Sequence, residues 1–359
     1  MTGFKLLKPP ATDEVEISLF GPGYGECVVC HLGDGAWMIV DSCLDPDTRK
    51  PVALSYLDGI GVPCTSVARI VATHWHDDHI LGLSDLIYAM QAAKLVVTSA
   101  FANKEFKSLI QKWAKGTTIF DGNGLGELKK VMTLTSNPIL ASEDKIIYER
   151  QGQIPCRVIA LSPSDASVLA CIARLNQIAP SLYLTRAPSI RGNDASVVLS
   201  IEVGDRRILL GGDLQIRNHR NHGWLAIVDN HKGYDRPKHH VFKIPHHGSK
   251  NGDHAEIWEH LLVPDPYAIL APFVGGKTKL PTDADLLRIK TSTTKASLTA
   301  QPTIGKFRLA NGTVAKTMKG AARSIEVIPH QFGHVRLRGK IGDSPEEWTV
   351  EYFGDAQSL

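Results

Sequence analysis

The stretch VATHWHDDHI, residues 71–80, guides the interpretation of the whole chain. An apolar run typical of a buried strand leads directly into His74, His76, Asp78 and His79. Imidazole and carboxylate groups are the usual protein ligands of zinc, manganese and iron. Alternate residues of an extended segment project to the same side, so the first two histidines can hold one ion. We expect Asp78 and His79 to lie where the chain turns, beside a second ion; the alternative is a polar loop in which histidines cluster by chance.

The composition of the 359-residue chain, with 43% hydrophobic and 21% charged residues, is that of an ordinary globular protein. A formal net charge of +3 permits a basic groove but does not by itself indicate a nucleic-acid-binding protein. The N-terminus lacks the apolar segment of a signal peptide, and no apolar run reaches the roughly 18 residues that a membrane helix needs. We therefore expect a cytoplasmic location and no membrane span.

The six cysteines are scattered along the chain, as is typical of reduced cytoplasmic thiols. Cys27 and Cys30 form a C-x-x-C within the strand-like run ECVVCHL. Residues three apart on a strand face opposite sides, and no second C-x-x-C completes a four-ligand site. We interpret both as buried apolar thiols, and a zinc or redox site as the alternative.

Two later blocks also end apolar runs at metal-ligating residue types. Residues 193–213, NDASVVLSIEVGDRRILLGGD, read as two strands that end at Asp213. Residues 239–249, HHVFKIPHHGS, read as a strand that ends at His246 and His247. Consecutive residues point in different directions, so one of these histidines should bind metal while the other faces substrate. The sequence leaves open which does which.

Five other histidines are expected in solvated loops rather than near a metal. They are His219, His222, His231, His239 and His240.

The order His-x-His-x-Asp-His, G-G-D and strand-HHGS resembles the metallo-β-lactamase superfamily. With G-x-G-E at residues 23–26 and N-D-x-S-V-V-L at residues 193–199, it looks like the soluble domain of the competence ComEC/Rec2-like subgroup, over roughly residues 15–290. The resemblance implies an α/β fold, a four-layer αβ/βα sandwich with the metal site at one edge between two sheets. It also implies that Asp213 bridges two metal ions and that Asp41, at the end of the strand AWMIVD, orients the histidine loop from behind.

The resemblance places the hydrolase domain at residues 12–300. Within it, residues 101–150 are polar and expected to be mostly helical, as an insertion or lid. Residues 301–359 are strand-rich and form a C-terminal extension, which is either the last strands of the sandwich or a small added module.

Most members of the superfamily supply a third histidine to the first metal, but here no histidine occurs from residue 80 to 218. The first site then keeps three protein ligands and must recruit water, Asn193 or a substrate oxygen. We expect two divalent ions, zinc or manganese, with the first bound more weakly. The ligands are His74, His76 and Asp213 for the first ion, and Asp78, His79, Asp213 and one of His246 or His247 for the second.

A hydroxide bridging two cations can attack an electrophile whose oxygen the metals polarise. Asp78 can also steer the attacking water, and whichever of His246 and His247 is free of metal can donate a proton. Candidate substrate contacts are Asn193, Ser196, Ser249 and Lys279.

The resemblance favours a phosphodiesterase or nuclease. Its substrate would be a phosphodiester, and single-stranded nucleic acid is a candidate. The alternative is a small-molecule ester, thioester or lactone hydrolase of the same fold. Nucleic acid would be held through its phosphates by basic residues around the HHGS strand, and the alternative is a solvated charged loop. Those residues are Lys232, Arg236, Lys238, Lys243 and Lys250. The sequence does not indicate an oligomeric state.

Overall fold

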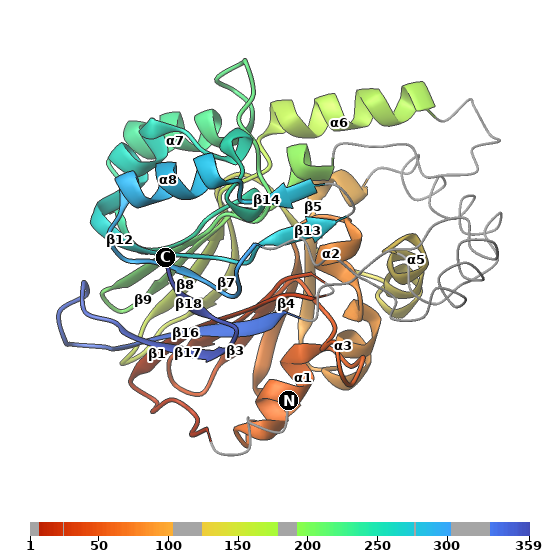
Figure 1. The fold of residues 1–359 in the computed structure, drawn as a ribbon. Coiled ribbons are helices and arrows are strands. Elements are labelled where there is room, and N and C mark those ends of the chain that lie inside the picture. The colour runs from red at the N-terminus through yellow and green to blue at the C-terminus, as the bar shows by residue number, and fades with distance from the viewer. Residues whose placement is uncertain (1–6, 24, 103–123, 179–191, 276–277, 303–330) are drawn as a thin grey trace, which may run out of the picture.

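The computed structural model describes residues 7–23, 25–102, 124–178, 192–275, 278–302 and 331–359. In these residues two eight-stranded sheets face each other, and helices cover the outer side of each sheet (Figure 1). This is the four-layer αβ/βα sandwich that the sequence predicted.

The first sheet contains the N-terminal strands and, at its edge, two strands from the end of the chain. Its order is β17-β16-β1-β2-β3-β4-β5-β6, parallel from β3 to β6 and antiparallel elsewhere. The strands are β1 (Glu14–Pro22), β2 (Cys27–Leu32), β3 (Trp37–Val40), β4 (Val67–Ala72), β5 (Lys94–Thr98), β6 (Ile139–Ala141), β16 (Phe332–Lys340) and β17 (Thr349–Gly354).

The second sheet has the order β18-β15-β12-β11-β10-β9-β8-β7. Its strands are β7 (Lys145–Arg150), β8 (Cys156–Ala160), β9 (Leu199–Val203), β10 (Arg206–Leu210), β11 (His239–Lys243), β12 (Leu262–Leu270), β15 (Ala296–Leu298) and β18 (Gln357–Ser358). A separate two-stranded antiparallel sheet is formed by β13 (Phe273–Gly275) and β14 (Thr278–Leu280).

Helices α1, α3 and α5 pack on the first sheet, and α7 and α8 pack on the second (Figure 1). In the described residues no helix is long and apolar enough to span a membrane. The helices are α1 (Val52–Gly59), α2 (Asp77–Ile80), α3 (Leu83–Ala89), α5 (Gly124–Leu134), α6 (Asp165–Ile178), α7 (Gly223–Gly233) and α8 (Asp283–Ser292). Shorter helical turns are η2 (Cys64–Ser66), η3 (Ser99–Ala102), η4 (Gly192–Ala195), η5 (His246–Gly248), η6 (Lys250–Gly252) and η7 (Ile257–Leu261).

Three apolar cores fill the three spaces between the four layers, because side chains alternate along each strand. On β2, Val28 and Cys30 point into the core between the sheets, whereas Cys27 and Val29 point into the core under α1 and α3. The two thiols of the C-x-x-C thus lie buried on opposite faces of one strand, unpaired with other cysteines. The prediction of buried apolar thiols is confirmed.

Residues 101–150 differ from the expected helical insertion. α5 is helical, but β6 joins the first sheet and β7 joins the second, so this segment supplies an edge strand to each sheet. Residues 103–123 of the predicted lid lie outside the described residues.

The described part of the C-terminal extension is built into the sandwich. β16 pairs with β1 along its whole length, and β18 pairs with β15 in the second sheet. Residues 303–330 of this strand-rich extension lie outside the described residues.

A buried carboxylate on β1 links that strand to β16. Glu16 on β1 is fully buried and accepts hydrogen bonds from the Tyr56 hydroxyl at 2.6 Å and the Ser18 hydroxyl at 2.8 Å. Arg338 on β16 supplies the compensating charge, with its Nη2 2.7 Å from Glu16 Oε2. A charge buried without a partner is costly, so this ion pair fixes the last strands to the first.

Arg338→Met should lower the free energy of unfolding by about 3 kcal/mol, because it leaves the Glu16 carboxylate buried without its cation. Lys340→Met on the same strand removes only an exposed pair with Asp13, 3.6 Å away, and should cost at most about 1 kcal/mol. Denaturant unfolding of both variants measures this. Equal stability of the two would contradict a structural role for the Glu16–Arg338 pair.

Candidate metal centre

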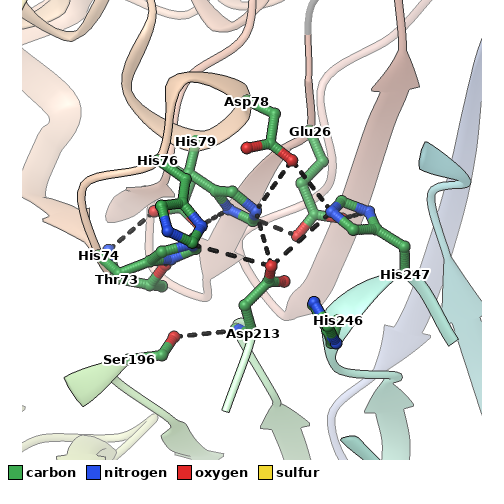
Figure 2. A network of polar contacts seen from close by, with 12 residues as sticks. Glu26, Thr73, His74, His76, Asp78, His79, Ser196, Asp213, His246 and His247 are labelled. Atoms are coloured by element: carbon green, nitrogen blue, oxygen red, sulfur yellow. Dashed lines mark hydrogen bonds and ion pairs between the residues drawn. The ribbon is translucent and has the colours of Figure 1, made fainter. Parts of the chain in front are cut away.

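The histidine loop is held in place by Asp41, which follows β3 with a left-handed φ of 61°. Its carboxylate accepts hydrogen bonds from the Thr73 backbone N–H at 2.7 Å and the Thr73 hydroxyl at 2.8 Å. It also accepts from Nδ1 of His79 at 2.8 Å. Since Nδ1 of His79 is hydrogen-bonded to Asp41, Nε2 of the same ring faces the centre of the site (Figure 2). Asp41 therefore lies where the sequence placed it.

One candidate ligand group consists of His74, His76 and Asp213. Nε2 of His74 lies 3.1 Å from Nδ1 of His76 and 3.8 Å from Oδ2 of Asp213. Ligand atoms around a tetrahedral zinc ion are about 3.3 Å apart when each bond is about 2.0–2.1 Å. These three side chains, two from the loop and one following β10, can thus share one ion.

A second group consists of Asp78, His79 and His247, and the same oxygen of Asp213 borders it. Nε2 of His79 is 3.7 Å from Asp78 Oδ2 and 3.4 Å from Asp213 Oδ2. Nε2 of His247 is 3.1 Å from Asp78 Oδ2 and 3.8 Å from Asp213 Oδ2. Asp213 thus lies between the two groups, as a bridging ligand would (Figure 2).

Unsatisfied atoms in the interior fit bound cations at this position. Nε2 of His79 and Oδ1 of Asp213 are buried and have no hydrogen-bond partner. Buried polar atoms are almost always paired, and imidazole nitrogen with carboxylate oxygen is the donor set that zinc and manganese prefer. The chemistry of the side chains therefore agrees with a two-ion centre.

Electrostatics also favour a cation here. Burial acts to lower the pKa of His79, but the carboxylates of Asp213, Asp78 and Asp41 outweigh it and hold that pKa well above its ordinary value. The pKa of His247 is raised for the same reason, against burial, by Asp213, Asp78 and Glu26. By contrast, burial and the neighbouring imidazoles lower the pKa of His74. The carboxylates that raise the pKa of His79 and His247 would likewise attract a cation to this place.

Gly25 and Glu26 pack directly against the histidine loop. A Cβ on Gly25, whose φ is +125°, would lie 2.0 Å from the carbonyl oxygen of Asp78. The backbone N–H of Glu26 donates to that same oxygen at 2.9 Å. Any side chain at residue 25 would push Asp78 away, so glycine is required by close approach to the site.

Glu26 and Lys243 are part of the site, and the sequence interpretation missed both roles. Both side chains are 2% exposed and form an ion pair, and Nζ of Lys243 also donates to the carbonyl of Gly212 at 3.1 Å. The Glu26 carboxylate lies 3.7 Å from Nδ1 of His79 and 3.6 Å from Nδ1 of His247. Glu26, His79 and Asp213 form a third group of possible ligand atoms, all within 4.8 Å of one another, so Glu26 borders the same centre.

Lys243 had been predicted to contribute to a phosphate-binding surface, and that prediction is wrong because the side chain is buried against Glu26. The sequence signal was a lysine inside the apolar run HHVFKIP, where a solvated charge cannot lie. Three other members of the predicted basic surface contact acidic residues or carbonyls: Arg236 with Asp144 at 2.6 Å, Lys232 with Glu256 at 3.9 Å, and Lys238 with the Glu259 carbonyl at 2.6 Å.

The structure separates His246 from His247 by an unusual backbone. Residues 246, 247 and 248 have successive φ values of 50°, 52° and 79°, a left-handed turn that is costly for residues other than glycine. The turn directs His247 into the second ligand group. His246 remains half-buried outside it, with Nδ1 2.6 Å from Oδ1 of Asn251 and its ring centroid 6.3 Å from that of His247.

The four predicted substrate contacts lie in different environments. Ser196 is fully buried and its hydroxyl accepts from the backbone N–H of Asp213 at 3.0 Å, so it positions that aspartate and does not face substrate. Ser249, two residues after His247, is half-buried, and Lys279 on β14 pairs with exposed Asp283 at 3.1 Å.

Asn193 follows a glycine that contacts the histidine loop. Its side chain is 6% exposed, and its Oδ1 is buried without a hydrogen-bond partner. The preceding Gly192 is in contact with the loop: a Cβ there would lie 3.2 Å from Nε2 of His76.

Three of the five histidines expected in solvated loops are buried instead. His239 and His240 belong to β11, and His231 belongs to α7. His239 bonds the Ser200 hydroxyl and the Leu261 carbonyl, each at 2.8 Å, and burial lowers its pKa to about 3. His239 and His240 are thus core residues with hydrogen-bond partners, whereas Nε2 of the buried His231 has none in the described residues. His219 is exposed and His222 half-buried, as expected for loop residues.

Comparison with known proteins supports the fold. A family model described as the metallo-beta-lactamase superfamily matches residues 20–129, which include the histidine loop. A search among curated proteins finds no match. The sandwich and the matched segment together confirm the predicted metallo-β-lactamase fold, with its candidate metal-binding residues at one edge.

Several solved structures are similar to this chain. One is the metallo-beta-lactamase fold protein YhfI from Bacillus subtilis, at 14% identity over 64% of this chain and 70% of that chain, with a TM-score of 0.33. Another is a metallo-beta-lactamase with a HARLDQ motif from Cronobacter sakazakii, at 13% identity over 63% and 76% of the chains, with a TM-score of 0.36. A third is the metallo-beta-lactamase SMB-1 bound to 2-mercaptoethanesulfonate, at 11% identity over 67% and 80%, with a TM-score of 0.33.

Proposed function

We propose that this chain is a metal-dependent hydrolase that cleaves phosphodiesters, of the ComEC/Rec2-like kind that its motifs resemble. The observation that carries the proposal is the single oxygen of Asp213 bordering two ligand groups, with a further imidazole, His246, beside them. When bound, two divalent ions would lower the pKa of a water molecule and polarise a phosphoryl oxygen. The ions would be zinc or manganese, since the ligands are imidazole and carboxylate.

The protein side chains take different parts in this proposal. Asp78 lies 3.1 Å from His247 and is partly exposed, so it can both hold a cation and accept a hydrogen bond from the attacking water. His246 is the imidazole left free of the ligand groups. It is half-buried and faces away from the core, where it can donate a proton to a phosphoryl oxygen or to the leaving group.

The same centre in a small-molecule hydrolase would act on an ester, thioester or lactone. Such an enzyme usually keeps a third histidine for the first metal, which this chain lacks between residues 80 and 218. The position of His246 favours the phosphodiester, because it supplies a proton donor beside the ions without being one of their ligands. Parallel assays with bis(4-nitrophenyl) phosphate, single-stranded DNA and a thioester separate the two functions.

Asp78→Asn and Asp213→Asn should each lower turnover of bis(4-nitrophenyl) phosphate by at least about 1000-fold, because each removes a charge that holds the cations. Asp77→Asn is the matched control: it changes an exposed neighbour of Asp78 and should leave activity within about twofold. Circular dichroism would establish that all three variants fold. Undiminished cleavage by the Asp78 and Asp213 variants would refute the proposal.

We further propose that the two ions are held unequally and that Asn193 completes the weaker site. In the described residues the first group offers three side chains, whereas the second offers Asp78, His79 and His247 together with the shared Asp213. Asn193 has a buried oxygen without a partner and follows the glycine that contacts His76.

Dialysis against a mild chelator should therefore remove one ion before the other, and activity should fall at the first step. Asn193→Ala should weaken binding of that first ion by roughly 10- to 100-fold, the range for residues that support a metal site. Metal analysis of the dialysed protein at each chelator concentration measures both effects. Simultaneous loss of two ions from the wild type would show that another group completes the first site.

A further inference from the structure

A polar chain extends from His246 away from the metal centre. The backbone N–H of His246 donates to the Gly212 carbonyl at 3.1 Å, which places this histidine beside Asp213. The amide nitrogen of Gln215 lies 3.4 Å from the ring nitrogens of His246, and Oε1 of Gln215 accepts from Nη2 of Arg217 at 2.9 Å. Imidazole, amide and guanidinium thus follow one another outward from the proposed reaction site.

The outer end of this series of polar side chains carries an excess of positive charge. Asp194 is 8% exposed and accepts hydrogen bonds from two guanidiniums, those of Arg217 and Arg174. One carboxylate balances only one of these two cations. In the described residues both hydrogen bonds of the Arg217 side chain use Nη2, and 24% of the side chain is exposed. Arg217 therefore retains donors for an anion that approaches from solvent.

A cation at this place would contact a different part of the substrate from the ions. Ions held by the two ligand groups would bind the phosphate that is hydrolysed. His246 follows beside Asp213, and Arg217 follows beyond Gln215. A guanidinium fork matches the oxygens of a phosphate group, and charge-assisted hydrogen bonds of this kind are the strong ones. Such a group contributes to binding only when the substrate carries a second anion next to the reacting one.

We propose that His246, Gln215 and Arg217 form a subsite for a second phosphate, adjoining the phosphodiester that is cleaved. This inference rests on the proposed phosphodiesterase activity and defines its substrate class. The substrate is a phosphodiester whose neighbouring nucleoside carries another phosphate, as in a nucleic-acid strand, and not an isolated diester.

The test compares dithymidine monophosphate with its 5′-phosphorylated and 3′-phosphorylated forms, using the manganese-loaded protein. The wild type should hydrolyse one phosphorylated form with a kcat/KM about 10-fold or more above that of the unphosphorylated form, and the preferred form shows on which side the subsite lies. Arg217→Met should abolish that preference while retaining hydrolysis of bis(4-nitrophenyl) phosphate, which has no second phosphate. Asp194 keeps Arg174 as a partner in this variant, so the fold should be retained.

Arg174→Met is the matched control, because it removes the other guanidinium from Asp194 without touching Gln215. It should leave the preference within about twofold. The inference is overturned if the wild type has no preference for either phosphorylated form. It is also overturned if Arg217→Met keeps the preference, or loses activity equally on all substrates.

Binding provides a readout that does not depend on hydrolysis. For phosphorylated hexathymidylate, Arg217→Met should lower the slope of log affinity against log salt by about 0.7 relative to wild type and Arg174→Met, the value for one single-strand phosphate contact. If no phosphodiester is cleaved, the proposed function fails, and this slope alone decides the subsite. An unchanged slope in Arg217→Met would then overturn it.

Discussion

The position of one carboxylate oxygen, Oδ2 of Asp213, constrains the rest of this structure. It lies 3.8 Å from Nε2 of His74, 3.4 Å from that of His79 and 3.8 Å from that of His247. The loop after β4 and the ends of β10 and β11 must therefore meet at one edge of the sandwich. The left-handed glycine before Asp213 has no room for a Cβ, which would lie 2.6 Å from the Ser196 hydroxyl, and that hydroxyl in turn holds the Asp213 backbone.

Concentrating charge in this way is costly, and the surrounding residues show how the cost is offset. Asp41, Glu26 and Asp213 are almost fully buried, and a buried carboxylate needs partners. Asp41 receives three hydrogen bonds, and Glu26 receives the ammonium of Lys243, a cation that remains whether or not metal is bound. The protein thus carries one fixed positive charge beside the imidazoles, and leaves the remaining negative charge to be balanced by protons or metal ions.

The local pattern of residues 71–80 predicted the histidine loop as candidate metal ligands, whereas the roles expected of Asp213 and Asp41 came from the resemblance. All three follow apolar runs and lie at the same edge of the sandwich. The choice between His246 and His247 depends on a run of three left-handed residues, which residue types alone do not indicate. The Glu26–Lys243 pair joins residues 217 positions apart, so neither partner showed a motif linking it to the other.

The same distinction applies to the fold. The strands that lead to the histidine loop, to Asp213 and to His246 were readable, since the pattern of a strand is local. The strands β6 and β7 were missed within the polar segment 101–150, because β6 has three residues and β7 is an edge strand with mostly exposed or half-buried side chains. Edge strands bury little apolar surface and therefore carry a weak hydrophobic pattern. The burial of His239 and His240 was missed because their partners, Ser200, Leu261 and the Arg207 backbone, belong to other elements.

The central claim is that Asp213 joins two ion sites through one carboxylate. Anomalous diffraction from crystals grown with manganese, recorded above and below its absorption edge, measures this directly. The account predicts two anomalous peaks about 3.5–4 Å apart, with the Asp213 carboxylate bound to both, His74 and His76 at one, and Asp78, His79 and His247 at the other. A single peak, or two peaks of which Asp213 contacts only one, would contradict it.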